Sequence, residues 1–281
     1  MTISRALNVA CGNTFISSPN WLNVDWGASY SGIQNFDVLK GLPYSESSFD
    51  VIYTSHFIEH LQLDDLKLFL LDCLRLLKPG GTIRIVTPCF EEMVYEFLKQ
   101  LESNHAILAS WVQAEILDQC VRTYPGGRIK EFRKLAENNK YLAEYIFDRE
   151  GFYFEARDEN HVTRTNNSRL LFFLRDKNLN SKIFSIKNIF VRYYIKVVCF
   201  FLPSWFKRNQ MSFTDPGEKH FWVYTFNELK LHLETLGFQK IEKLDFKSTK
   251  TGFDDLLKLD KSPIGDYPRK GKQSMFVEAI K

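Results

Sequence analysis

The sequence predicts an α/β fold in which helices flank a mostly parallel sheet. Short apolar runs alternate with helical patterns over the first 88 residues, and each run ends in a glycine-rich, acidic or polar turn. The end of the chain returns to the same alternation after a long helical stretch. Strand, helix and strand repeated in this way form a parallel sheet with right-handed crossovers.

The early strands are predicted from four short apolar runs that read as buried on both faces. They cover residues 6–10, 21–25, 49–54 and 82–87. A helix precedes the last run, because apolar residues recur at helical spacing from Leu66 to Leu77 and Pro79-Gly80-Gly81 follows. The first and second strands are so close in sequence that a helix between them can have only about two turns.

The end of the chain predicts one more helix and two more strands. The helix covers 226–238 and is stopped by Gly237, and the strands cover 239–246 and 272–280. The segment 247–271 is polar and contains Pro and Gly, so we expect a long surface loop there. The intervening stretch reads as mostly helical.

Composition narrows the class of protein. The 281 residues are 44% hydrophobic and 25% charged, as in a globular rather than a disordered chain. A net charge of +3 disfavours nucleic acid as a partner. The five cysteines are dispersed without a C-x-x-C pair, which indicates reduced thiols. We find neither a signal-peptide pattern nor ~18 consecutive apolar residues, so we expect a cytoplasmic protein.

The turn after the first strand predicts a site for a nucleoside-like cofactor. It contains Asn8, Ala10, Cys11, Gly12, Asn13 and Thr14. A tight turn of this kind lets backbone amides face a ligand. Asp25 ends the second strand, where a carboxylate can accept hydrogen bonds from both ribose hydroxyls. Trp26 follows. Its side chain either flanks the adenine or ribose or packs against the protein.

The segments LNVACGN, WLNVD, LPYSESSFDVIY and LLKPGGTIRIVTP resemble the core of class I S-adenosylmethionine-dependent methyltransferases, nearest to their type 11 group. The resemblance implies a Rossmann-like sheet of seven strands and S-adenosylmethionine as cofactor. It implies a core formed by residues 1–89 and 222–281. Residues 90–221 are then a mostly helical insertion that caps the substrate.

The resemblance also implies roles for individual residues. Asp37 accepts from the adenine amino group, the amide of Val38 meets the ring, and Ser55 follows the fourth strand at the site. Only Gly12 stands where the family has glycine; Ala10 replaces another and adds only a methyl group. Asn8 replaces an acidic residue. These departures motivate one alternative, a catalytically silent partner protein with this fold.

Two groups of residues are candidates for catalysis at the edge of the sheet that faces the cofactor. His56 and His60 follow the fourth strand, whereas His220 and Tyr224 precede the last helix. A methylated oxygen benefits from a general base, which is commonly histidine. His60 reads equally well as the anchor of a helix start. His161, in the insertion, is a further candidate.

A metal site is a second interpretation of the first group. His56, Glu59 and His60 are spaced i, i+3, i+4, so they could hold a divalent ion on one helix face. A hydrogen-bonded trio explains the same spacing, and we predict no metal.

The acceptor is predicted from the insertion and from the overall layout. Residues 177–214 contain seven Lys or Arg and no Asp or Glu, and 183–208 interleaves basic and aromatic residues. We expect a cap helix there, with contact to a membrane surface or to anionic groups as the alternative. The S-H-x-x-E-H-L run and the late H-x-x-x-Y resemble methyltransferases of bacterial capsule and lipopolysaccharide pathways. They imply O-methylation of a sugar or glycan. The basic stretch is compatible with an acceptor that bears a phosphate group. A quinone or other lipid-like small molecule is the alternative acceptor.

Overall fold

The computed structural model describes residues 5–26, 30–151, 193–195, 197–212, 214 and 217–281. The chain divides into two compact units, one formed by residues 1–153 and 214–281 and the other by 154–213. His161 and most of the second unit lie outside the described residues. Helix α8 (Ser204–Gln210) belongs to the second unit. The predicted boundaries between core and cap stay a prediction.

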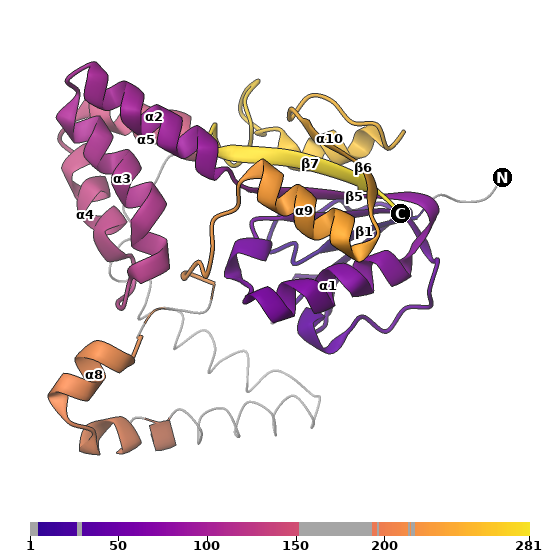
Figure 1. Ribbon diagram of the computed structural model, residues 1–281, viewed down its shortest axis with the longest axis horizontal. Helices are drawn as coiled ribbons and strands as arrows, with labels where there is room; N and C mark the ends of the chain where they lie inside the picture. The colour runs from indigo at the N-terminus through magenta and orange to yellow at the C-terminus, as the bar shows by residue number, and fades with distance from the viewer. Residues whose placement is uncertain (1–4, 27–29, 152–192, 196, 213, 215–216) are drawn as a thin grey trace. The chain divides into compact units, whose positions relative to one another are not determined.

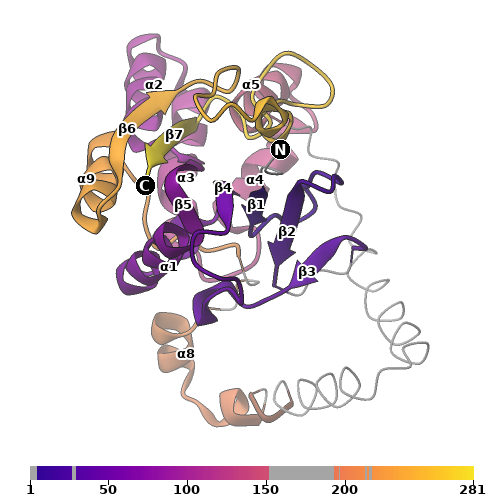
Figure 2. The ribbon, with the colours of Figure 1, turned by 90° about the vertical axis from the view of Figure 1, so that its right-hand side faces the viewer.

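A seven-stranded sheet forms the centre of the first unit (Figures 1 and 2). Its order is β3-β2-β1-β4-β5-β7-β6. The strands are β1 (Ala6–Val9), β2 (Trp21–Asp25), β3 (Ile33–Asn35), β4 (Phe49–Ser55), β5 (Leu77–Pro88), β6 (Gln239–Leu244) and β7 (Ser274–Ile280). β1 to β5 are parallel, and β7 is antiparallel to β5 and β6. The predicted fold class is confirmed, with β3 added to the strands predicted from sequence.

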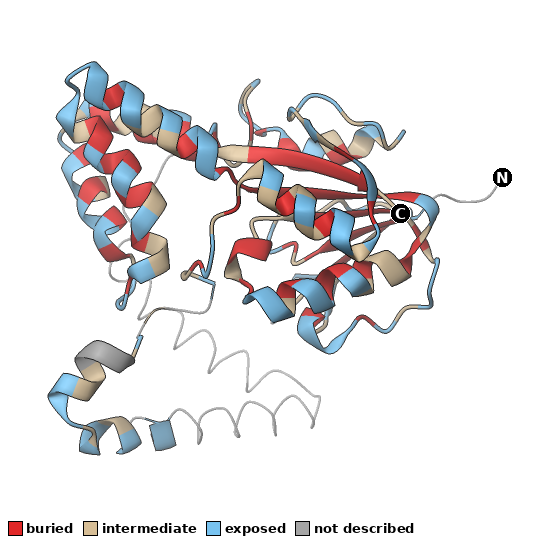
Figure 3. Cartoon of the chain, viewed as in Figure 1, coloured by how far each residue is buried: buried red, intermediate tan, exposed pale blue. Residues whose placement is uncertain are grey.

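Helices α1 (Leu63–Leu76) and α9 (Phe226–Leu236) cover one face of the sheet (Figure 1). Each buries an apolar stripe against the sheet and leaves its outer side exposed to solvent (Figure 3). The Thr225 side chain caps α9 by accepting from the amide of Glu228 at 3.1 Å. Gly237 ends the helix in a left-handed conformation with φ of 105°. The predicted helix 226–238 is therefore confirmed.

The segment between β6 and β7 covers part of the opposite face, so the prediction of a surface loop over 247–271 is wrong. It forms η3 (Asp254–Leu256) and α10 (Leu257–Asp260), whose Leu256 and Leu259 are buried against the sheet. Asp260 accepts from Tyr53 Oη and pairs with Arg84 Nε, each at 2.8 Å. Arg84 is fully buried and therefore requires such partners. These contacts hold the segment on the sheet.

The prediction of a short helix between β1 and β2 is also wrong. Turns connect the two strands instead, in a stretch that contains Ser17, Ser18, Pro19 and Asn20. Side chains satisfy its backbone carbonyls: Asn8 Nδ2 donates to Thr14 O at 3.0 Å. Asn23 Nδ2 likewise donates to Ile16 O at 2.9 Å. Turn-forming residues and side-chain bonds thus replace a helical ladder.

Four helices follow β5 within the same compact unit: α2 (Phe90–Glu102), α3 (Ala106–Val121), α4 (Gly127–Ala136) and α5 (Lys140–Glu150). They confirm the helices predicted for this part of the insertion. A buried ion pair between Arg149 and Glu115, at 2.9 Å, joins α5 to α3. No described helix has the length and apolar character needed to span a membrane.

Candidate cofactor pocket and histidine cluster

A pocket of about 180 Å³ lies at the carboxyl ends of β1 and β4. It is lined by Asn8, Ala10, Cys11, Gly12, Asn13, Thr14, Tyr53, Ser55, His56, Leu259, Arg269 and Lys270. The structure therefore brings together the predicted residues of the turn, the end of β4 and one predicted catalytic histidine. Topology explains this, because the carboxyl ends of neighbouring parallel strands share one edge of the sheet.

The turn after β1 passes through the left-handed region at two residues. Gly12 has φ of 55°, which suits a residue without Cβ. Ala10 has φ of 53°, where an L side chain is strained by about 1 kcal/mol. The replacement of a glycine at position 10 thus adds backbone strain, and not merely the methyl group expected from sequence.

Asn8 gives the pocket a buried acceptor. Its Nδ2 donates to Thr14 O and to Asn23 Oδ1, at 3.0 and 3.2 Å. Its Oδ1 is buried and has no hydrogen-bond partner among the described residues. Leaving a buried acceptor unpaired costs about 1–3 kcal/mol. A ligand that donates a hydrogen bond would remove this cost.

Asp25 lies beside the turn and is bonded to it. Its Oδ2 accepts from the Gly12 amide at 2.7 Å. A carboxylate accepts through both oxygens, so this bond is compatible with a ribose hydroxyl on the other one. Trp26, which follows, is 65% exposed.

Asp37 and Val38 lie outside the residues that line the pocket. The Asp37 side chain caps η1 (Val38–Lys40) by accepting from the Leu39 amide at 3.2 Å, and it pairs with Lys40 at 3.0 Å. The Val38 side chain is buried in the core. Their contact with adenine stays a prediction.

His56 and Glu59 form a pair beside the pocket. His56 Nδ1 lies 3.2 Å from Oε1 of the fully buried Glu59. Thr87 Oγ1 donates to the other oxygen, Glu59 Oε2, at 3.2 Å. Burial opposes ionisation of Glu59, but His56 and the neighbouring histidines outweigh it and lower its pKa to about 2. Burial lowers the pKa of His56, which favours neutral imidazole.

His60 and His220 meet on the other side of Glu59. Their ring centroids are 4.8 Å apart. His60 Nδ1 lies 2.8 Å from Lys219 O, so this nitrogen carries a proton and donates it. His220 is buried, its Nδ1 has no partner among the described residues, and burial lowers its pKa to about 4. The sequence placed both at one edge of the sheet, and the structure brings them into contact.

The set of atoms that could hold a metal differs from the one considered from sequence. Ligand atoms of Glu59, His60 and His220 lie within 4.8 Å of one another. His56 is instead engaged by Glu59 and by Ser274, whose Oγ lies 2.9 Å from Nε2. The absence of a metal stays a prediction.

Tyr224 is buried in the core rather than placed in the pocket. Its ring packs edge-on against His232, with centroids 6.2 Å apart. Burial raises the pKa of its phenol to about 12, so it stays protonated at neutral pH. In a catalytic role, the Tyr224 hydroxyl could therefore act only as a hydrogen-bond or proton donor, not as a base.

Sequence reasoning missed the basic residues that line the pocket. Arg269 and Lys270 come from the segment that was predicted to be a surface loop. One signal could have found them: β7 is antiparallel, so the residues just before it lie at the cofactor edge of the sheet. The sequence Pro268-Arg269-Lys270-Gly271 occupies that place.

Part of the chain is similar to known proteins. Residues 17–85 match a family model described as a methyltransferase domain. A SAM-dependent methyltransferase from Archaeoglobus fulgidus is 14% identical, with 99% of this chain and 86% of that chain covered and a TM-score of 0.37. A possible histamine N-methyltransferase from Thermotoga maritima is 12% identical, with 99% and 82% covered and a TM-score of 0.35. No curated protein matches significantly.

The sheet order is that of the class I methyltransferase fold, and residues 17–85 match a methyltransferase domain. The protein is an S-adenosylmethionine-dependent methyltransferase. Its cofactor is S-adenosylmethionine. The residues present fit this molecule. The turn after β1 and Asp25 would hold its nucleoside side. Asn8 Oδ1, which has no hydrogen-bond partner among the described residues, suits its ammonium group.

Proposed function

We propose that the protein methylates a hydroxyl oxygen of a sugar or glycan intermediate in surface polysaccharide biosynthesis, in the cytoplasm. The observation that supports it best is the pairing, at 3.2 Å, of the buried Glu59 with His56, which lines the cofactor pocket. A buried carboxylate that orients an imidazole is the arrangement of a general base. The sugar itself is inferred from the sequence resemblance.

In this proposal His56 takes the proton of the acceptor. When bound, S-adenosylmethionine supplies an electrophilic methyl group. His56 Nδ1–H donates to Glu59, which leaves the Nε2 lone pair to accept the hydroxyl proton. Ser274 Oγ lies 2.9 Å from this nitrogen and 3.1 Å from Lys270 O. With Nδ1 protonated, Nε2 accepts from the Ser274 hydroxyl, so the acceptor hydroxyl must take the place of Ser274 as the donor to this nitrogen.

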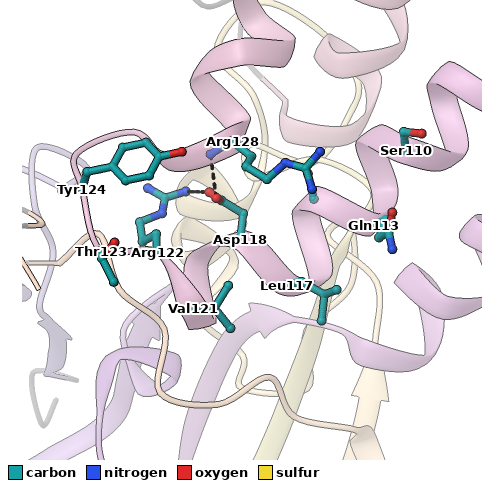
Figure 4. Close-up of a pocket in the computed structure, with 10 residues that line it drawn as sticks. Ser110, Gln113, Leu117, Asp118, Val121, Arg122, Thr123, Tyr124 and Arg128 are labelled. Atoms are coloured by element: carbon teal, nitrogen blue, oxygen red, sulfur yellow. Dashed lines mark hydrogen bonds and ion pairs between the residues drawn. The ribbon is translucent and has the colours of Figure 1, made fainter. Parts of the chain in front are cut away.

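A second pocket supports a phosphate-bearing acceptor. It encloses about 290 Å³ between α3 and α4 (Figure 4). Arg122 is joined there to Asp118, whereas the Arg128 guanidinium has no ion-pair partner among the described residues. A planar guanidinium suits phosphate oxygens. Helix α3, which forms one side of this pocket, also contacts the histidine cluster. The His220 amide donates to Gln119 O of α3 at 2.9 Å.

Contact with a membrane surface through residues 183–208 is part of the proposal. Of this stretch, 183–192 and 196 lie outside the described residues. The aromatic side chains that are described and exposed there are Tyr193, Tyr194, Phe200, Phe201 and Trp205. Aromatic residues interleaved with basic ones suit an interfacial site, where a lipid-linked glycan would be met.

The test is a product assay with nucleotide-linked sugars as acceptors. We expect formation of S-adenosylhomocysteine together with a sugar product heavier by one methyl group. His56→Asn should lower turnover about 10²–10⁴-fold without weakening S-adenosylhomocysteine binding. His105→Asn, on an exposed histidine of the insertion, is the matched control. Undiminished turnover of His56→Asn would remove the residue from this role.

A metal-assisted methylation of a quinone or other lipid-like acceptor is the second candidate function. The juxtaposition of Glu59, His60 and His220 favours it. Under this alternative, a chelator abolishes activity and magnesium or zinc restores it. Activity that is indifferent to chelator supports the metal-free base.

A further inference from the structure

The connection between β6 and β7 delivers a lysine to the cofactor pocket. We propose that Lys270 binds the carboxylate at the amino-acid end of S-adenosylmethionine, while Asn8 Oδ1 accepts from its ammonium group. Lys270 lines the pocket together with Asn8 and the turn after β1. The proposal adds a binding residue from a part of the chain far from the glycine turn.

Lys270 differs from every other lysine of its segment. Lys247, Lys250, Lys258, Lys261 and Lys272 each pair with a carboxylate. Lys270 has no ion-pair or hydrogen-bond partner for its ammonium group among the described residues, although it is partly buried. An unpaired charge in such a place is costly unless a ligand compensates it.

The backbone around Lys270 is firmly held. Arg269 Nε donates to Leu259 O at 2.9 Å, and the Arg269 amide donates to Asp260 O at 2.6 Å. Gly271, with φ of 74°, packs so tightly that a Cβ there would lie 1.8 Å from Arg149 O. The backbone at Lys270 is thus positioned before a ligand binds, which reduces the backbone entropy lost on binding.

The pocket matches a zwitterion in both charge and size. Among the described residues, the ammonium group of Lys270 and the buried acceptor Asn8 Oδ1 are the lining groups of opposite character that lack a partner. Its volume of about 180 Å³ is below the ~300–1,000 Å³ of pockets that hold whole ligands, so it suits one end of the cofactor. Charge-assisted hydrogen bonds to a carboxylate are among the stronger polar contacts.

The test compares two ligands that differ in the amino-acid end. S-adenosylhomocysteine carries it, whereas 5′-methylthioadenosine lacks it. We expect Lys270→Met to weaken S-adenosylhomocysteine binding about 10- to 100-fold in calorimetry and to leave 5′-methylthioadenosine binding unchanged. Lys272→Met is the matched control, since Lys272 is exposed and pairs with Asp148 at 2.7 Å. It should bind both ligands as the wild type does.

Two further measurements separate the proposal from a structural effect. Decarboxylated S-adenosylmethionine keeps the ammonium group but not the carboxylate, so it should bind wild type and Lys270→Met equally. Lys270→Arg should restore part of the affinity for S-adenosylhomocysteine. Unchanged S-adenosylhomocysteine binding in Lys270→Met overturns the proposal. So does an equal loss for 5′-methylthioadenosine, which would show a general distortion of the pocket.

Discussion

The Nδ1 atom of His56 lies 3.2 Å from Oε1 of Glu59, a carboxylate with no exposed surface. Because Glu59 raises the proton affinity of His56, Glu59→Gln should make His56 a weaker base. We expect turnover to fall at least 10-fold, with unchanged binding of S-adenosylhomocysteine. Titration of the His56 ring by NMR should show a lower pKa in the variant. An unaltered His56 pKa would contradict the coupling.

Burial of His220 predicts an acid-sensitive fold. Its pKa falls from 6.5 to about 4, so folding favours the neutral ring. The resulting stability is present above pH 6.5 and is lost as pH falls toward 4, about 2 kcal/mol of it between pH 7 and pH 5. Urea unfolding of the wild type and of His220→Phe at both pH values measures this.

The comparison with His220→Phe isolates this histidine from other groups. Asp260, for example, has a pKa that burial raises to about 6. Its protonation favours folding as the pH falls, and this contribution is the same in both proteins. The wild type should therefore lose more stability on acidification than the variant. Equal losses would show that His220 does not titrate between these pH values.

Much of the fold follows from local pattern, and its exceptions have physical causes. The run of apolar residues in β1 and the cap at Thr225 are local signals, and the structure confirms both elements. The segment 247–271 looks polar, yet Arg84 on β5 recruits Asp260 from it. Such a long-range ion pair leaves no periodic trace in sequence.

The sequence predicts those residues of the candidate site that lie at the ends of the parallel strands. Strand ends place Asn8, Gly12 and His56 at one edge, and these line the pocket. The contact between the His60 and His220 rings depends on the path of the chain before α9. The spacing of residues in the sequence does not predict that path. Lys270 was missed because the register of an antiparallel strand decides which loop residue reaches the edge.

The strained turn predicts a stabilising substitution. Ala10→Gly should raise the free energy of unfolding by up to about 1 kcal/mol, because glycine adopts φ of 53° without strain. Ala143→Gly, inside α5, is the control with opposite sign and should cost about 1 kcal/mol. Urea unfolding at neutral pH compares the two. A destabilised Ala10→Gly would contradict the strain.

Arg128 of the α3–α4 pocket, which has no ion-pair partner in the described part of the chain, predicts an effect on the acceptor alone. Arg128→Ala should raise the KM for a phosphate-bearing acceptor about 10-fold, since a charge-assisted bond is lost. S-adenosylhomocysteine binding should not change. Lys130→Ala, on an exposed residue of the same helix, serves as control. An effect of the same size in the control would point to general charge rather than to a built site.

The most direct test of the cofactor site is calorimetric binding of S-adenosylhomocysteine to the wild type and to Asp25→Ala. Asp25 holds the turn through Gly12 at 2.7 Å and offers its carboxylate to ribose. We predict micromolar binding to the wild type and at least a 10-fold loss in the variant, with Asp64→Ala unaffected. Wild-type protein that binds no S-adenosylhomocysteine, or Asp25→Ala that binds it equally well, would contradict the account.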